Sequence, residues 1–176
     1  MEIYIGCGLT HVPRKRFKSY ASFIHRLASE LREQPFSHRV RYALVDSDPQ
    51  LALKPFGDRA KLCYLWDRSM VEHAELVIAE ASYPSLGLGI EMQIAEHAGK
   101  PIIIAFQRTD TNKAKPVSYR NPDSSDHVLQ IGEGYVSLMA LGIPTVMGVV
   151  AYHSTVEGIA GVLRAVEDLS RPAAPP

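Results

Sequence analysis

The sequence predicts an α/β fold that is doubly wound in the flavodoxin-like or Rossmann-like manner, with a mostly parallel five-stranded sheet and helices on both faces. Three observations predict it. Short aliphatic runs alternate along the chain with segments whose apolar residues recur at helical spacing. Two of the runs, 75–81 and 101–106, are almost continuously apolar, which is typical of strands buried on both faces. The 176 residues are enough for a single buried core.

The first third of the chain supplies two strands and one helix. A strand is expected at 2–6, where aliphatic and aromatic residues lead into the glycine-bearing loop Gly6-Cys7-Gly8. A helix is expected over about 17–31, because apolar residues recur there at helical spacing. The second strand is expected at 39–45, and it ends in the turn 46–49, which contains Asp, Ser and Pro.

The middle of the chain carries the clearest pattern. A second helix is expected over 59–73, followed by the apolar strand 75–81. The loop 84–89 then enters a third helix that extends to about residue 98. Gly99 is a good helix stop, because a glycine adopts the left-handed conformation at a helix end without strain. The next strand, at 101–106, is predicted to be buried.

After this strand the pattern breaks. The segment from about 107 to 134 is polar, and we expect it to be an inserted excursion over the edge of the sheet. We predict one nucleotide-binding domain over 1–170 and a disordered Pro/Ala tail over 171–176. The remaining expected elements are a short helix at 135–141, a strand at 145–152 and a helix at 156–169.

Composition excludes several classes of protein. The 19 basic residues balance the 19 acidic ones, so neither nucleic acid nor a membrane surface is an expected partner. The apolar runs are too short to span a bilayer, and no secretory signal is visible at the N-terminus. The two cysteines, Cys7 and Cys63, form no CxxC pair. The expectation is a reduced, cytoplasmic protein.

The loop 84–89 has two interpretations of about equal weight. Its glycines, Gly87 and Gly89, let a ligand approach the backbone, and the following helix N-terminus suits a phosphate group. Alternatively, the loop is only a tight turn in which Ser85 caps the helix. The sequence is not a P-loop, because no Gly-Lys-Ser/Thr follows.

Two carboxylates are the candidate catalytic residues. Glu91 is surrounded at helical spacing by apolar residues, so it lies on the helix face that should meet the sheet. Asp67 likewise has no basic neighbour three or four positions away. A carboxylate on an inner face is costly to bury unless it has a partner or a task. Alternatively, Glu91 is favoured by the helix dipole and reaches solvent, and Asp67 bonds to a loop.

The sequence gives little support for metal-dependent or serine-hydrolase chemistry. The seven histidines form no HExxH motif and no ligand-like cluster with cysteine, so no metal site is expected. No Gly-x-Ser-x-Gly elbow indicates a serine hydrolase. We expect no cofactor.

The segment 79–91, Ala-Glu-Ala-Ser-Tyr-Pro-Ser-Leu-Gly-Leu-Gly-Ile-Glu, resembles the signature of the nucleoside 2-deoxyribosyltransferase superfamily. It is most similar to the branch of 2'-deoxynucleoside 5'-phosphate N-hydrolases and CMP N-glycosidases. The resemblance implies that Glu91 is the nucleophile and that Ser85, Gly87 and Gly89 hold a 5'-phosphate. An upstream Asp that positions the sugar falls on Asp67 without a gap.

Two further segments extend this resemblance over most of the chain, leaving 107–134 as extra. Residues 7–20 align with the family's first loop, which makes Gly8 and His11 expected substrate-binding residues; the hydrolase branch has an Arg where this chain has His11. Residues 136–142 resemble a segment in which a Ser reaches the phosphate bound by the neighbouring subunit. The resemblance therefore implies a homodimer with a shared active site, to which Ser137 contributes.

The implied activity is hydrolysis of the N-glycosidic bond of a (deoxy)ribonucleoside 5'-monophosphate, giving free base and (deoxy)ribose 5-phosphate. One alternative is base exchange between deoxynucleosides, as in the transferases. A second alternative is a nucleotide-sensing module without turnover, because a neutral His11 is a poorer anion partner than an arginine.

Overall fold

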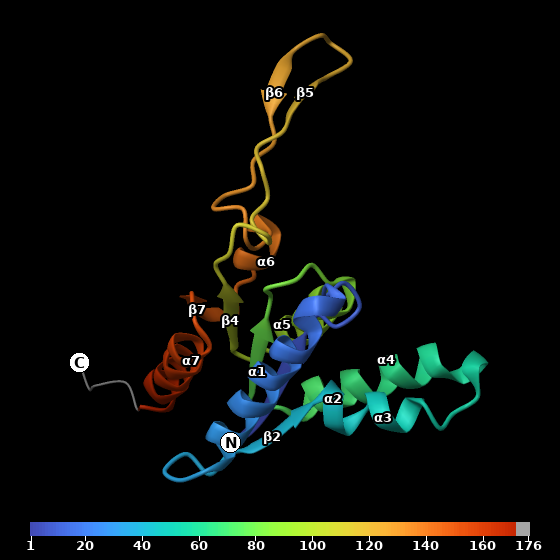
Figure 1. The fold of residues 1–176 in the computed structure, drawn as a ribbon, viewed down its shortest axis with the longest axis vertical. Helices are drawn as coiled ribbons and strands as arrows, with labels where there is room; N and C mark the ends of the chain where they lie inside the picture. The colour runs from blue at the N-terminus through green and yellow to red at the C-terminus, as the bar shows by residue number, and fades with distance from the viewer. Residues whose placement is uncertain (172–176) are drawn as a thin grey trace.

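The computed structural model describes residues 1–171, so all but the first residue of the predicted tail lies outside the described residues. A parallel five-stranded sheet forms the centre of the molecule, in the order β2-β1-β3-β4-β7 (Figure 1). This confirms the predicted fold class. The strands are β1 (Glu2–Cys7), β2 (Arg39–Tyr42), β3 (Leu76–Glu80), β4 (Ile102–Gln107) and β7 (Val146–Tyr152).

The register of the sheet brings the ends of its strands together. Cys7 at the end of β1 pairs with Glu80 at the end of β3, and Gln107 at the end of β4 pairs with Tyr152 at the end of β7. Because all of these strands run in the same direction, the loops that follow them meet at one edge. In open α/β sheets, ligands bind at this carboxyl edge.

Two layers of helices cover the sheet. Apolar residues of α1 (Arg14–Arg32) and α7 (Thr155–Ser170) bury one face, and those of α4 (Phe56–His73) and α5 (Leu86–His97) bury the other. Alternate strand residues serve the two layers, since Ile3 and Ile5 pack with α1 while Tyr4 packs with α4 and α5. No helix within residues 1–171 is long and apolar enough to cross a membrane.

The predicted boundaries differ from the observed ones mainly around the second strand. The expected strand 39–45 ends at Tyr42, and the chain continues into two short helices, α2 (Ala43–Asp46) and α3 (Asp48–Leu51). The carboxylate of Asp46 accepts a hydrogen bond of 2.9 Å from the backbone N–H of Tyr42, which closes this turn. The predicted stop at Gly99 is confirmed, with a φ of +64°.

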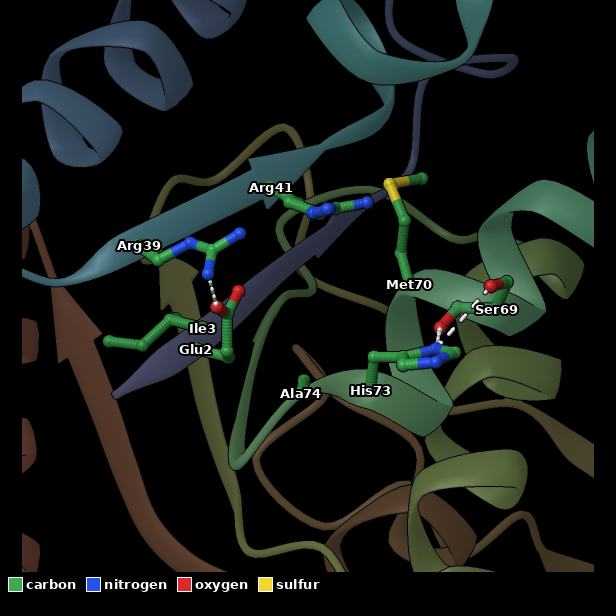
Figure 2. A pocket seen from close by; sticks show the side chains of 8 residues that line it. All are labelled: Glu2, Ile3, Arg39, Arg41, Ser69, Met70, His73 and Ala74. Atoms are coloured by element: carbon green, nitrogen blue, oxygen red, sulfur yellow. Dashed lines mark hydrogen bonds and ion pairs between the residues drawn. The ribbon is translucent and has the colours of Figure 1, made fainter.

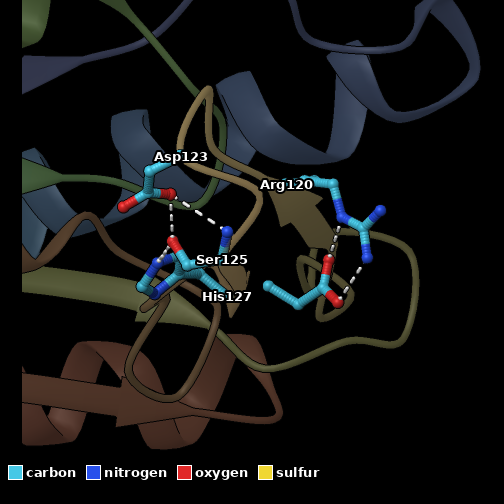
Figure 3. Close-up of polar contacts among 5 residues, drawn as sticks. Arg120, Asp123, Ser125 and His127 are labelled. Atoms are coloured by element: carbon cyan, nitrogen blue, oxygen red, sulfur yellow. Dashed lines mark hydrogen bonds and ion pairs between the residues drawn. The ribbon is translucent and has the colours of Figure 1, made fainter.

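The polar insertion contains a hairpin that extends far from the sheet (Figure 1). Its strands are β5 (Ser118–Arg120) and β6 (Asp126–Val128), and all six of their residues are exposed. Figure 3 shows how polar contacts hold the hairpin end: Arg120 makes two hydrogen bonds to Asp126, and Ser125 bonds to both Asp123 and His127. Asp123 bonds to Ser125 and not to the imidazole, so this group is a turn and not a catalytic triad.

A hollow of about 420 Å³ lies near the amino ends of the strands, away from the loops that follow them. Figure 2 shows its lining residues from β1, β2 and the end of α4. Arg39 is paired with Glu2 at 2.9 Å, and Nδ1 of His73 is 2.7 Å from the carbonyl oxygen of Ser69. Charges on an edge strand such as β2 also discourage pairing with other chains. The candidate catalytic carboxylates are not among its lining residues.

Candidate active site

Glu91 lies against the end of the first strand. It belongs to α5, and the backbone of Gly6 in β1 passes directly beside it. A Cβ added at Gly6 would stand 2.6 Å from Oε2 of Glu91 and 2.9 Å from a methyl carbon of Leu88. Only a glycine therefore lets α5 pack this closely on β1, and this packing places the carboxylate at the carboxyl edge of the sheet.

The carboxylate of Glu91 is held in a poorly solvated position. Its Oε2 is buried and has no hydrogen-bond partner, and the hydroxyl of Tyr4 is also buried without one. Burial and then the negative charge of Asp67 raise the pKa of Glu91 to about 8. The Tyr4 phenol opposes this rise. It therefore lies near the carboxylate, although its geometry falls outside that of a regular hydrogen bond.

Asp67 reaches the same region from α4. Its Oδ2 accepts a hydrogen bond of 3.3 Å from Sγ of Cys63, and its buried Oδ1 has no partner. Burial and the adjacent Asp67 raise the pKa of Cys63 to about 11, so the thiol stays protonated at neutral pH and acts as the donor. Arg68 and Glu72 pair at 2.7 Å on the outer face of α4, as their spacing predicts.

The loop before α5 ends in a helix cap. The helix begins at Leu86, and the Oγ of its N-cap, Ser85, accepts a hydrogen bond of 3.1 Å from the N–H of Leu88. Ser85 therefore caps the helix, while the predicted binding role of the loop is untested by this contact. The cap leaves the hydroxyl proton of Ser85 and the amides of Leu86 and Gly87 free to bind a ligand.

The two glycines of the predicted anion loop lie inside the helix. Gly87 and Gly89 belong to the first turn of α5, where we expected a loop, and neither has a positive φ. A Cβ added at Gly87 would meet only Oγ of Ser85, at 3.7 Å, and one at Gly89 would meet nothing within 4 Å. Neither glycine is required by the fold here. Their effect is to leave the start of α5 without side-chain bulk.

Gly8 joins the first loop to this helix start. A Cβ added there would stand 2.9 Å from both Cβ of Ser85 and the carbonyl oxygen of Tyr83. The backbone after β1 therefore touches the backbone before α5. This contact places two of the predicted binding residues, Gly8 and Ser85, beside each other.

The other two predicted binding residues, His11 and Ser137, are both exposed. His11 is exposed in the loop before α1. Ser137 is exposed as the N-cap of α6 (Leu138–Leu141), and its Oγ accepts a hydrogen bond of 3.3 Å from the N–H of Met139. Within a single chain, neither side chain has a hydrogen bond to the residues around Glu91.

Sequence reasoning did not single out three residues at this edge of the sheet: Tyr4 and Cys63 lie near the carboxylates, and Glu80 lies at the end of β3 with partners in the α1 and α7 layer. In the sequence, Tyr4 is an ordinary core residue of a strand. Only its spacing of two from Gly6 indicates that its ring lies on the same side of the sheet as α5. Cys63 lies one helical turn before Asp67, which is a signal that helical spacing does contain. Glu80 is buried at the end of β3, and the sequence shows it as one charge in an apolar run.

No group of three or more His, Cys, Asp and Glu side chains suited to a metal ion occurs within residues 1–171. The groups that the structure places at this edge are two carboxylates, a phenol, a thiol and a helix N-terminus.

Known proteins provide three points of comparison. No protein-family model matches the chain. In sequence, 105 residues are 29% identical to the 5-hydroxymethyl-dUMP N-hydrolase of Rattus norvegicus, which is 57% of this chain and 58% of that protein. The chain thus spans little more than half the length of this curated relative.

In structure, the chain resembles the CMP N-glycosidase BcmB of Clostridium botulinum. The TM-score is 0.53 at 16% identity, and the match covers 92% of this chain and 98% of that one. A conserved protein from Enterococcus faecalis V583 gives a TM-score of 0.55, also at 16% identity, over 92% of this chain and 96% of that one. The chain therefore has the fold of this CMP N-glycosidase and is similar in sequence to a nucleotide N-hydrolase, which confirms the predicted resemblance to the branch of nucleotide N-hydrolases and CMP N-glycosidases.

Proposed function

We propose that this protein is an N-glycosidase that hydrolyses a (deoxy)ribonucleoside 5'-monophosphate to free base and (deoxy)ribose 5-phosphate. The observation that carries the proposal is the buried, unpartnered carboxylate of Glu91 beside Asp67, next to the N-terminus of α5. A buried carboxylate without a hydrogen-bond partner is costly for the fold, so its presence in such a place indicates a function. The names of the hydrolase and glycosidase relatives support the same reaction class.

In the proposed reaction, the carboxylate of Glu91 attacks C1' of the sugar. The C1'–N bond breaks, its electron pair leaves with the base, and the base nitrogen takes up a proton. The resulting glycosyl ester is then hydrolysed by water, which restores the carboxylate. Oδ1 of Asp67, which has no partner in the protein, is available to hold a sugar hydroxyl or to transfer a proton.

Phosphate binding at the start of α5 would position the sugar. The Ser85 hydroxyl and the first-turn amides are donors, and the positive end of the helix dipole favours an anion. Because Glu91 lies about one and a half turns further along the same helix, binding energy gained at the phosphate aligns C1' with the carboxylate.

The direct test is to incubate the protein with a panel of ribo- and deoxyribonucleoside monophosphates and to measure free base by chromatography. Glu91→Gln is nearly isosteric and should reduce base release by several orders of magnitude, as the removal of other nucleophiles does. Base exchange would instead require an acceptor base and would not depend on the phosphate. Wild-type rates in a folded Glu91→Gln variant would exclude Glu91 as nucleophile.

One observation favours the second candidate, a nucleotide-sensing module. The position that should supply a cation to the phosphate holds the exposed side chain of His11. Tight monophosphate binding by calorimetry, with no free base in the same sample, would identify such a module.

We also propose a homodimer with a shared site. Seven large apolar side chains are exposed on α4, α5 and α6, the helices on one side of the sheet: Phe56 (87%), Tyr64 (46%), Leu65 (44%), Leu86 (88%), Ile90 (52%), Leu138 (48%) and Met139 (85%). A second copy of the chain is the partner for this surface that the family resemblance suggests, and Ser137 lies directly beside the exposed residues of α6.

The free thiols Cys7 and Cys63 fit a reducing compartment, and we propose the cytoplasm.

A further inference from the structure

Ser82 lies between the end of β3 and the start of α5, and its polar atoms are all engaged. Its hydroxyl donates to Oε1 of Glu80, and its N–H lies 3.3 Å from Oε2 of the same carboxylate. The Ser82 Oγ also accepts a hydrogen bond of 2.7 Å from the N–H of Gln107 at the end of β4. Ser82 is therefore fixed against both neighbouring strand ends.

Glu80 anchors this arrangement from inside the protein. Its side chain is completely buried, and Oε1 also accepts a hydrogen bond of 2.8 Å from the hydroxyl of Tyr152 at the end of β7. Burial raises the pKa of Glu80, while the hydrogen bonds oppose this rise. The carboxyl group of Glu80 thus connects the end of β3 directly to that of β7, and through Ser82 to that of β4.

The polar insertion joins the same network through Asn112. Its Nδ2 donates to the carbonyl oxygens of Ser82, at 3.1 Å, and Gln107, at 2.6 Å. Its Oδ1 accepts from the N–H of Thr109 at 3.0 Å and from the hydroxyl of Thr109 at 2.8 Å. The amide of Asn112 is thus fully hydrogen-bonded, and it ties the first turn of the insertion to Ser82 and to the end of β4.

Only two residues separate Ser82 from the helix cap at Ser85, and both are restrained. The ring of Tyr83 packs edge-to-face on Tyr20 at 5.0 Å, and Pro84 has a fixed φ. The direction of the Ser82 carbonyl therefore largely sets where Ser85 and the first amides of α5 point.

We infer that Asn112 is a positioning residue: through Ser82, it holds the start of α5 in the geometry that binds phosphate. The phosphate ligand in this inference rests on the proposed function. The mechanical connection from Asn112 through Ser82 to α5 does not. It gives the insertion, whose β5–β6 hairpin lies far from α4 and α5 (Figure 1), a direct link to the candidate site.

The test compares three variants. Asn112→Ala removes the whole amide. Asn112→Asp keeps the acceptor for Thr109 but replaces the donor to Ser82 with an oxygen. Asn121→Ala is the matched control, because Asn121 lies in the same insertion and its bonds to Ser124 and Ser125 use only its backbone. Hydrogen exchange of the peptide spanning 82–89 is the first readout, and it requires no substrate.

We expect the exchange of 82–89 to become at least about tenfold faster in both Asn112 variants, with the strands and the Asn121→Ala control unchanged. Wild-type exchange of 82–89, or uniformly faster exchange across the whole sheet in both variants, would overturn the inference. The second readout is binding: the affinity for a nucleoside monophosphate should fall about five- to tenfold more than that for the matching nucleoside. Equal losses for both ligands would also overturn it. A wild-type protein that neither binds nor cleaves any monophosphate would refute the proposed function, while the exchange result alone would still decide the role of Asn112.

Discussion

At the scale of single residues, Glu91 has two opposing requirements. A nucleophile must be ionised, but burial and the charge of Asp67 raise the pKa of this carboxyl to about 8. At neutral pH the group is therefore mostly protonated when the site holds no ligand. The proposed mechanism consequently predicts a rate of base release that increases with pH through this range.

Asp67→Asn should shift this pH dependence. Without the neighbouring negative charge, the carboxyl of Glu91 ionises more easily, so the pH at which the rate reaches half its maximum should decrease. The maximal rate should also fall, because Asp67 is proposed to act on the sugar or on a proton. Rate profiles from pH 5 to 9 for both proteins measure the two effects separately. An unchanged midpoint would show that the two carboxylates do not interact.

The raised pKa of Glu91 also predicts an effect on stability. Because the folded state has the higher pKa, it binds more protons than the unfolded chain between about pH 4.5 and pH 8, and this group's contribution to stability declines over that interval. Glu91→Gln removes the cost of ionising a buried group. The variant should exceed the wild type in free energy of unfolding by about 4 kcal/mol at pH 8, and by less than about 1 kcal/mol at pH 5. Denaturant titration at both pH values tests this, and a difference independent of pH would contradict the raised pKa.

At the scale of elements, the start of α5 can be tested with a matched pair of substitutions. Gly87→Ala and Gly89→Ala both add a methyl group in open space, without strain from a positive φ. Each should therefore maintain or raise stability, by up to about 1 kcal/mol, because alanine favours a helix over glycine. A loss of monophosphate binding in either variant must then come from contact with the ligand.

Ser85→Ala should affect both stability and binding. The loss of the cap to Leu88 should lower the free energy of unfolding by about 1 kcal/mol. Affinity for a monophosphate should decrease more than affinity for the matching free nucleoside, because only the former loses the hydroxyl donor. Calorimetric titration of both ligands measures the difference. Equal losses would show that Ser85 is only a helix cap.

At the scale of the whole molecule, the proposed dimer makes the active site a property of two chains. Sedimentation should show the mass of a dimer, and a monomer at working concentration would refute the shared site. If Ser137→Ala alone is inactive, mixing it with inactive Glu91→Gln chains should restore activity. Random exchange makes half of the dimers mixed, and one of their two sites is intact, so about one quarter of the wild-type activity should return. No recovery after confirmed exchange would place both residues in the same chain's site.

The sequence by itself determined the order of the five sheet strands and of the long helices, because apolar runs and helical spacing are local properties. It did not predict the short helices α2 and α3 or the hairpin of β5 and β6. It also determined that Glu91 faces the sheet, since its helical neighbours are apolar, and that Arg68 pairs with Glu72. The loop motif indicated the resemblance to nucleotide N-hydrolases and CMP N-glycosidases that the comparisons support. The roles assigned to the site residues, namely the catalytic roles of Glu91 and Asp67 and the binding roles of Gly8, His11, Ser85, Gly87, Gly89 and Ser137, stay predictions.

The tertiary structure alone decided what surrounds the carboxylates. Sequence patterns do not reveal distances between segments. Neither the close packing of Gly6 against Glu91 nor the position of Tyr4 was therefore predictable. The same holds for Glu80 and Asn112, whose partners come from strands and loops far apart in the chain. A buried polar group is stable only if it finds hydrogen bonds, and which groups supply them depends on how the strand ends meet.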